Sequence, residues 1–155
     1  MGVGKTATCQ IMKKKLHNSV FLDGDWCWDM HPFQVTDETK QMVIANICFV
    51  LNSFIKCSVY DHIVFCWVMH DQGIIDDLLS NIDTSKCQIH LISLICDKQV
   101  LQARLLTDVE AGIRSKDIVL RSIERIPLYD KLDTCKVDVS NITPEQVAEF
   151  IIQKC

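Results

Sequence analysis

The sequence predicts an α/β protein whose parallel β-sheet is covered by helices on both faces. Short apolar segments alternate along the chain with segments whose apolar residues recur at helical spacing. Residues 63–69 are apolar without interruption, which is typical of a strand buried on both faces of a sheet. Parallel strands require long crossover connections, and the helical segments supply them. The expected architecture is a three-layer sandwich with the sheet in the middle.

Composition limits the classes of partner. The 155 residues are 48% hydrophobic and 23% charged, and no repeat or linker-like stretch divides them, so residues 1–155 are expected to form a single domain. The formal net charge of −4 provides no basic field that would attract nucleic acid or an anionic membrane. We therefore expect no nucleic acid and no membrane among the partners.

The cysteines indicate a reducing environment. There are nine of them, an odd number, with no Cys-x-x-Cys pair. Most lie inside apolar runs, where a free thiol behaves as a small hydrophobic group. This pattern argues against a disulfide scaffold or a zinc site. The longest apolar run is too short to cross a bilayer and no signal peptide is recognised, so we expect a cytoplasmic protein.

Four strands, each followed by a helix, are expected along the chain. The strand segments are rich in β-branched and apolar residues and span residues 20–22, 62–69, 88–95 and 135–139. Helices are expected over residues 7–16, 37–56, 74–79 and 116–125, and two more begin after Asp97 and Thr143. Thr36 and Thr143 are assigned as N-caps. Residues 108–115 are expected to form a loop, and Pro127 to follow the end of a helix.

The start of the chain carries a phosphate-binding motif. Gly4-Lys5-Thr6 matches the end of the loop pattern Gly, four residues, Gly-Lys-Ser/Thr. Lys5 would reach the β- and γ-phosphates, and the Thr6 hydroxyl would hold Mg²⁺. Glycines allow backbone N–H groups to approach phosphate closely, at the N-terminus of the helix that follows. The expected nucleotide-binding residues are Gly2, Val3, Gly4, Lys5, Thr6 and Ala7. The alternative is a flexible N-terminus that contains Gly-Lys-Thr by chance.

The order of features resembles the small P-loop kinases of metabolites and nucleotides, which include shikimate, gluconate, adenylylsulfate and nucleoside-monophosphate kinases. The resemblance rests on Gly-Val-Gly-Lys-Thr, on Asp23-Gly24-Asp25 after the apolar segment 20–22, and on residues 101–105 and 137–145. It covers essentially the whole chain. It implies the P-loop NTPase fold, with ATP and Mg²⁺, and leaves the acceptor open.

The resemblance also implies a sheet with strand order 2-3-1-4-5, in which the strand before the phosphate loop is central and missing from this chain. With the missing strand counted as the first, the third and fourth strands are residues 62–69 and 88–95. They would then face a gap lined by unpaired backbone N–H and C=O groups. From typical strand and loop lengths, we expect the chain to be truncated at its N-terminus by about ten residues.

Asp23 and Asp25 follow a strand end, where α/β sheets place ligands. One carboxylate could take the proton of the substrate hydroxyl while the other contacts Mg²⁺ through water. The resemblance favours Asp23 as the base, which leaves Asp25 as the metal contact. A simple turn is the alternative, because Asp-Gly is a frequent turn sequence. Trp26 and Trp28 could stack on a substrate or pack in the core.

A mobile lid of approximately residues 104–126 is implied by the same resemblance. Its arginines would neutralise charge on the transferred phosphoryl group. The candidates are Arg104, Arg114, Arg121 and Arg125. Each could instead lie on a solvated face, and Asp117 with Arg121 is an ordinary i,i+4 pair. On resemblance alone, adenine is expected near Ser140 and Asn141.

One departure from the family pattern concerns the end of the strand over residues 62–69. A Walker-B pattern would place Asp at its end, but His70 and Asp71 follow instead. We expect Asp71 to cap the next helix, with a water-mediated Mg²⁺ contact as the alternative. A metal role for His70 is not expected, because no second histidine lies at ligand spacing.

The combined interpretation is ATP-dependent phosphoryl transfer to a small metabolite, nucleoside or nucleotide. A GTPase-type switch is disfavoured because the chain contains neither Asp-x-x-Gly nor Asn-Lys-x-Asp. An ATP-binding but non-catalytic relic of a P-loop kinase is the other alternative. The acceptor and the oligomeric state cannot be read from the sequence.

Overall fold

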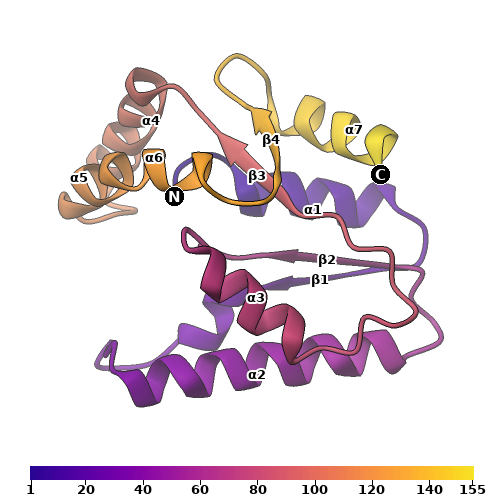
Figure 1. Cartoon of the computed structure of the whole chain (residues 1–155). Coiled ribbons are helices and arrows are strands. Elements are labelled where there is room, and N and C mark those ends of the chain that lie inside the picture. The colour runs from indigo at the N-terminus through magenta and orange to yellow at the C-terminus, as the bar shows by residue number, and fades with distance from the viewer.

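The computed structural model describes residues 1–155, in which strands alternate with helices (Figure 1). The strands are β1 (Ser19–Asp23), β2 (His62–Cys66), β3 (Ile92–Ile95) and β4 (Cys135–Asp138). The helices are α1 (Lys5–Lys15), the 3-10 helix η1 (Gly24–Trp28), α2 (Asp37–Lys56), α3 (Gln72–Ser80), α4 (Lys98–Glu110), α5 (Asp117–Glu124), α6 (Ile126–Asp130) and α7 (Pro144–Lys154). No helix is long and apolar enough to cross a membrane.

The strands form two separate parallel pairs. β1 pairs with β2, from Ser19 opposite His62 to Asp23 opposite Cys66. β3 pairs with β4, from Ile92 opposite Cys135 onward. β2 and β3 are not hydrogen-bonded to each other. The predicted α/β fold with parallel strands is confirmed, and so is the interruption of the sheet between the second and third strands of the chain.

Helices cover both faces of the β1–β2 pair. On one face, Phe21 and Val64 pack against Met12 of α1. On the other face, Leu22 packs in a cluster with Val43 and other side chains of α2 and α3. Neighbouring residues of β1 therefore point to opposite layers, as the pleat of a strand requires. This is the two-sided burial that the apolar runs predicted.

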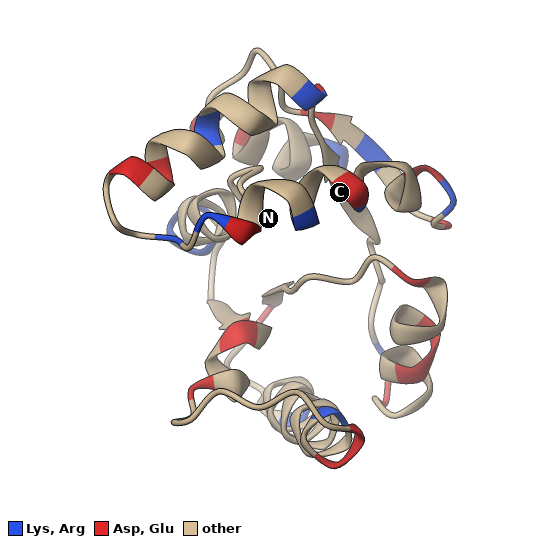
Figure 2. Ribbon diagram, turned by 90° about the vertical axis from the view of Figure 1, so that its left-hand side faces the viewer, with Lys and Arg blue, Asp and Glu red and all other residues tan.

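β3 and β4 belong to a second core, built with α4, α5 and α7. Leu105, Val139 and Val147 are its most deeply buried members. Helix α1 connects the two halves, because it packs against β1, β2 and α7. Figure 2, turned about the vertical axis, shows the two halves one above the other.

Several element boundaries differ from the expected ones. β2 ends at Cys66 because its partner β1 ends at Asp23, so residues 67–69 continue without a partner. β3 is shorter than predicted, since pairing with β4 begins only near Leu91. Helix α4 runs on to Glu110, into the predicted loop. Pro127 opens α6, as its fixed φ and missing N–H permit in a first helical turn.

Candidate phosphate-binding site

The N-terminus of α1 is shaped to receive an anion. Its N-cap is Gly4, which adopts φ 88° and ψ 17° and provides no side-chain cap. Gly2 also has a positive φ, 76°. The first helical hydrogen bond runs from the Thr8 N–H to the Gly4 carbonyl, at 2.9 Å. The N–H groups that precede Thr8 in the first turn therefore have no partner within the helix, and the positive end of the helix dipole lies with them.

A polar cavity opens at this helix terminus. Two cationic side chains, from Lys5 and Arg114, line it together with three carboxylates. The lining residues are Met1, Gly2, Gly4, Lys5, Thr6, Ala7, Asp23, Asp25, Asp108 and Arg114. Eight of the predicted site residues therefore meet at one cavity with backbone donors: Gly2, Gly4, Lys5, Thr6, Ala7, Asp23, Asp25 and Arg114. Val3 lies outside it and packs against the core of the β3–β4 half.

Asp23 links the strand to the phosphate loop. Its side chain is buried at 5% exposure, and its Oδ2 accepts a hydrogen bond of 2.8 Å from the Thr6 hydroxyl. Its Oδ1 accepts from the Asp25 N–H at 3.1 Å, which caps η1. Both carboxylate oxygens of Asp23 are thus engaged by the protein. The buried carboxylate fixes the Thr6 side chain relative to β1.

Asp25 has a different environment. Partial burial, and then the negative charge of Asp23, raises its pKa above the ordinary value of 3.8, with Lys5 among the groups that oppose the shift. Gly24 between the two aspartates is needed for space, because a Cβ at that position would lie 2.5 Å from the Trp67 ring. The turn therefore packs tightly onto the segment after β2. The Asp25 carboxyl group therefore keeps its proton to a higher pH than an ordinary aspartate does.

The four arginines separate into different environments. Arg114 lines the cavity and its Nε donates to Asp108 Oδ2 at 2.8 Å. Arg121 pairs with Asp117 at 2.8 Å on the exposed surface of α5. Burial is the main cause that lowers the pKa of the Met1 amino group and of His70, and the nearby charge of Arg125 lowers both further. Asp108 was not predicted as a site residue, and only its place in the lid segment could have suggested it.

Arg104 and Ser140 meet at the loop after β4. The Arg104 guanidinium donates to the carbonyls of Val139 at 3.0 Å and Ser140 at 3.3 Å. The Ser140 hydroxyl donates to Asp138 Oδ1 at 2.6 Å and accepts from the Asp97 N–H at 2.9 Å. These bonds connect the loop to Arg104 of α4 and to Asp97 after β3. Asn141 is exposed beside it.

Asp71 caps α3, as the sequence analysis favoured. Its Oδ1 accepts from the Gly73 N–H at 2.8 Å. His70 precedes it, and its Nδ1 is buried without a hydrogen-bond partner. Burial, followed by the charge of Arg125, lowers the pKa of His70.

The residues at the cavity fit a magnesium ion that accompanies phosphate. Mg²⁺ prefers oxygen ligands and usually keeps several waters, with one or two protein groups and phosphate oxygens completing its shell. Thr6, Asp23 and Asp25 offer such oxygens at one place. No group of three or more His, Cys, Asp and Glu side chains in residues 1–155 is arranged so that it could hold a metal ion by itself. The donor set suits a nucleotide-borne ion better than a permanent metal centre.

A comparison with known protein families gives one match. A family model described as AAA domain matches residues 1–124. No curated protein sequence matches the chain significantly.

Many solved structures have a similar fold, among them the following three. A tunicamycin resistance protein of Deinococcus radiodurans aligns with a TM-score of 0.73 and 20% identity over 99% of this chain and 89% of its own. A gluconokinase of Sinorhizobium meliloti aligns with a TM-score of 0.65 and 18% identity over 96% and 83%. A sugar kinase of Janibacter aligns with a TM-score of 0.68 and 15% identity over 98% and 87%. At these identities the similarity establishes the fold.

Proposed function

Because this chain belongs to the AAA-domain family of P-loop proteins and has the fold of small kinases, we propose that it transfers the γ-phosphoryl group of ATP to a small acceptor. The observation that carries the proposal is the meeting of a phosphate-binding helix terminus with a carboxylate pair. Lys5 and Thr6 line the same cavity as Asp23 and Asp25. A protein that only binds nucleotide has no need of a second carboxylate there.

The polar groups that line the cavity would bind the phosphates of the nucleotide. The free N–H groups from Gly4 to Ala7 would hold the phosphate oxygens, and Lys5 would neutralise the β- and γ-phosphates. Mg²⁺, when bound, would stabilise the charge that develops on the phosphates. Thr6 would contribute its hydroxyl to that ion, and the buried Asp23 would orient Thr6 and accept from metal-bound water.

We assign the general base to Asp25. The sequence favoured Asp23, but both Asp23 oxygens already accept hydrogen bonds from the protein. The backbone N–H of Asp25 is used, whereas its carboxylate lines the cavity. Its raised pKa makes the Asp25 carboxylate a stronger base than an ordinary aspartate. Its carboxylate would accept the proton of the acceptor hydroxyl as the oxygen attacks the γ-phosphorus.

The arginines take separate roles in this proposal. Arg114 lines the cavity and would bind phosphate oxygens, either after breaking its hydrogen bond to Asp108 or while keeping that bond. Arg125 is near the start of the phosphate loop. Arg104 would act by holding the loop at Ser140 and Asn141, where we propose that adenine binds. Arg121 would reach phosphate only by leaving Asp117, which an exposed ion pair allows at small cost.

For the acceptor we propose a chemical class and no individual compound. Two of the similar structures are described as a gluconokinase and a sugar kinase. A polyhydroxylated metabolite is therefore the first acceptor class to test, followed by nucleosides and nucleotides.

The second candidate is an ATP-binding protein without turnover. The gap between β2 and β3 favours it, because Lys5 and Met1 line that gap as well as the phosphate cavity. Open space behind a phosphate loop would let the loop move, and catalysis depends on close positioning of the reacting groups.

Lys5→Ala tests the proposed function. We expect ATP affinity to fall at least tenfold by calorimetry, and ADP release with sugar acids, sugars and nucleosides to be abolished. Lys14→Ala is the matched control, because Lys14 is an exposed lysine of the same helix. Unchanged ATP affinity in Lys5→Ala would refute the phosphate site. Retained affinity in the unaltered protein without ADP release from any acceptor would select the non-catalytic alternative.

A further inference from the structure

Two cysteine thiols meet between α1 and β2. Cys9 lies in the second turn of α1, and Cys66 is the last residue of β2. Cys66 is 6% exposed and forms an apolar cluster with Phe21 and Val64, against which Cys9 packs. Cys9 itself is only partly buried. One member of the pair is therefore accessible to solvent, and the other is enclosed by the protein.

The two thiols are hydrogen-bonded to each other. This bond is the main cause that lowers the pKa of Cys9, and it also raises the pKa of Cys66. A thiol is a weak donor and a weak acceptor, so such a bond needs the two sulfur atoms in contact. The charges of Lys5 and Asp23 act on both thiols. The pair therefore lies beside the phosphate site.

The thiol contact lies next to the hydrogen bond that connects the phosphate loop to β1. Asp23 is opposite Cys66 in the register of β1 and β2. Thr6, which donates to Asp23 at 2.8 Å, precedes Cys9 by three residues and so lies on the same face of α1. The Thr6–Asp23 bond and the Cys9–Cys66 contact thus join α1 to two neighbouring strands, about one helical turn apart.

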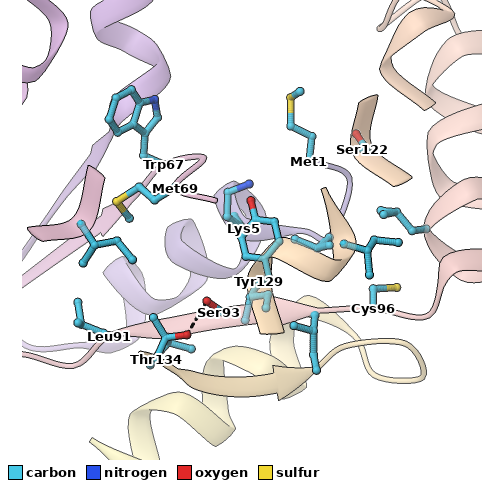
Figure 3. Close-up of a pocket in the computed structure, with 17 residues that line it drawn as sticks. Met1, Lys5, Trp67, Met69, Leu91, Ser93, Cys96, Ser122, Tyr129 and Thr134 are labelled. Carbon is cyan, nitrogen blue, oxygen red and sulfur yellow. Dashed lines mark hydrogen bonds between the residues drawn. The ribbon is translucent and has the colours of Figure 1, made fainter. Parts of the chain in front are cut away.

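Neither thiol lines a cavity, but residues close to both of them do. Cys9 and Cys66 are absent from the lining of the phosphate cavity and from that of the apolar cavity between the two halves. Lys5 and Trp67, the residue directly after Cys66, both line the apolar cavity (Figure 3). A covalent change at the thiols would therefore leave both cavities open. It would act on them by moving α1 relative to β2.

We propose that Cys9 and Cys66 form an oxidation site, at which a peroxide converts the two thiols to a disulfide that weakens nucleotide binding. With hydrogen peroxide, the Cys9 sulfur attacks one oxygen, the O–O bond breaks, and Cys9 sulfenic acid and one water form. The Cys66 sulfur then attacks the Cys9 sulfur and the S–O bond breaks. The hydroxyl group leaves with the Cys66 proton as a second water. The two electrons lost by the thiols reduce the peroxide.

The disulfide would change the position of α1. Non-bonded atoms in contact lie about 3.5–4 Å apart, whereas the sulfur atoms of a disulfide lie about 2.05 Å apart. Closing this difference requires α1 and β2 to approach each other or both side chains to rotate. The Thr6–Asp23 bond is the neighbouring link between α1 and this strand pair, so it would be disturbed first.

A disturbed phosphate loop should bind nucleotide less tightly. Misplacing a functional group by about 1 Å can cost about 100-fold in rate. For binding, which needs less accurate positioning than catalysis, we expect ATP affinity to fall about tenfold on oxidation. This consequence rests on the proposed function, whereas the formation of the disulfide does not.

The first test uses the unaltered protein without nucleotide. The reduced protein is treated with a small excess of hydrogen peroxide, the remaining thiols are alkylated, and the protein is digested without reductant. We expect mass spectrometry to find a peptide that links Cys9 to Cys66. Cys57 is the matched comparison, because it is also partly buried but lies at the end of α2. It should remain a thiol, which the alkylating reagent labels.

The second test measures ATP affinity by calorimetry in the reduced, the oxidised and the re-reduced protein. We expect the loss of affinity to be recovered with dithiothreitol, which does not reverse methionine oxidation. Cys66→Ala should keep its ATP affinity through the peroxide treatment and should accumulate Cys9 sulfenic acid, which dimedone traps. Cys57→Ser should lose affinity as the unaltered protein does.

Each outcome bears on the proposal. A peptide that links Cys9 to Cys66, together with a reversible loss of affinity, supports it. Equally fast oxidation of Cys57, or disulfides spread over many cysteines, would mean unselective oxidation and would overturn it, as would a pair that stays reduced. If the disulfide forms and ATP affinity is unchanged, the oxidation site stands and its effect on the phosphate loop is refuted. If the reduced protein does not bind ATP, the proposed function fails, while the linked peptide still decides the oxidation site.

Discussion

Position 4 requires glycine because of its backbone conformation, not because neighbouring atoms leave too little space for a side chain. Its φ is 88°, whereas an added Cβ would meet nothing closer than Pro144 at 3.9 Å. A side chain would therefore fit sterically among its neighbours but would strain the backbone at the point where the phosphate donors begin.

We predict that Gly4→Ala lowers the free energy of unfolding by about 1–2 kcal/mol, the usual penalty for a left-handed Ala, and also weakens ATP binding. The control is Asn18→Ala, at a non-glycine position with φ 42° far along the chain from the phosphate loop. Asn18→Ala should also reduce stability but leave ATP affinity unchanged. Denaturant titration and calorimetry measure both. Equal ATP affinities for the two variants would show that the Gly4 conformation does not matter for binding.

Asp25 gives a pH prediction with a definite sign. Its folded-state pKa lies above the usual 3.8, because of burial and then Asp23. Its contribution to stability is therefore fully present below the unfolded pKa and is lost as pH rises through the raised folded pKa. Asp25→Asn should thus have a higher Tm than the unaltered protein at pH 7, and the difference should vanish below about pH 3.8.

The activity should depend on pH with the opposite sign to the stability contribution of Asp25. A base must be ionised, so phosphoryl transfer should fall as pH decreases through the raised pKa, and Asp25→Asn should abolish it. The exposed neighbour Asp29 provides the control, because Asp29→Asn should change neither the Tm profile nor the turnover. If Asp23→Asn abolishes turnover while Asp25→Asn retains it, the assignment of the base returns to Asp23.

At the scale of elements, strong local signals were sufficient. The apolar periodicity and the Thr36 cap predicted α2 as residues 37–56, and the structure has the same bounds. Thr143, Pro144 and Gln146 predicted the start of α7, where the capping box is present. These features depend on neighbours within one helical turn, so a sequence pattern contains all the interactions that decide them.

Elements whose limits depend on distant residues were less predictable. The end of β2 is set by the end of β1, and the start of β3 by its pairing near Cys135. In the site, Lys5, Thr6, Asp23 and Asp25 were predicted from motifs and meet in one cavity. Asp108 could not be selected, because its contact depends on where the folded chain places Arg114. Asp-Gly-Asp predicted a turn or a site; the structure has the turn, as η1, and both carboxylates line the cavity, where a functional role stays a prediction.

At the scale of the molecule, the phosphate cavity connects two separately packed halves. Asp23 and Asp25 come from the half with α2 and α3, whereas Asp108 and Arg114 come from the half with α4 and α5. The two main apolar clusters have no residue in common. Without ligand, α1 is the main packed link between the halves. Their free energies of opening are therefore expected to differ.

Binding of Mg-ATP should reduce the difference between the free energies of opening of the two halves. At one hundred times its dissociation constant, a ligand of the native state adds about 2.7 kcal/mol of stability. Since the cavity draws side chains from both halves, we predict slower amide exchange in β1 and in β4 alike, measured by hydrogen-exchange mass spectrometry. Lys5→Ala should show no such slowing, and Lys14→Ala should respond as the unaltered protein does. Slowing in only one half would mean that nucleotide is held by one half alone, and that the lid residues near Arg114 do not contact it.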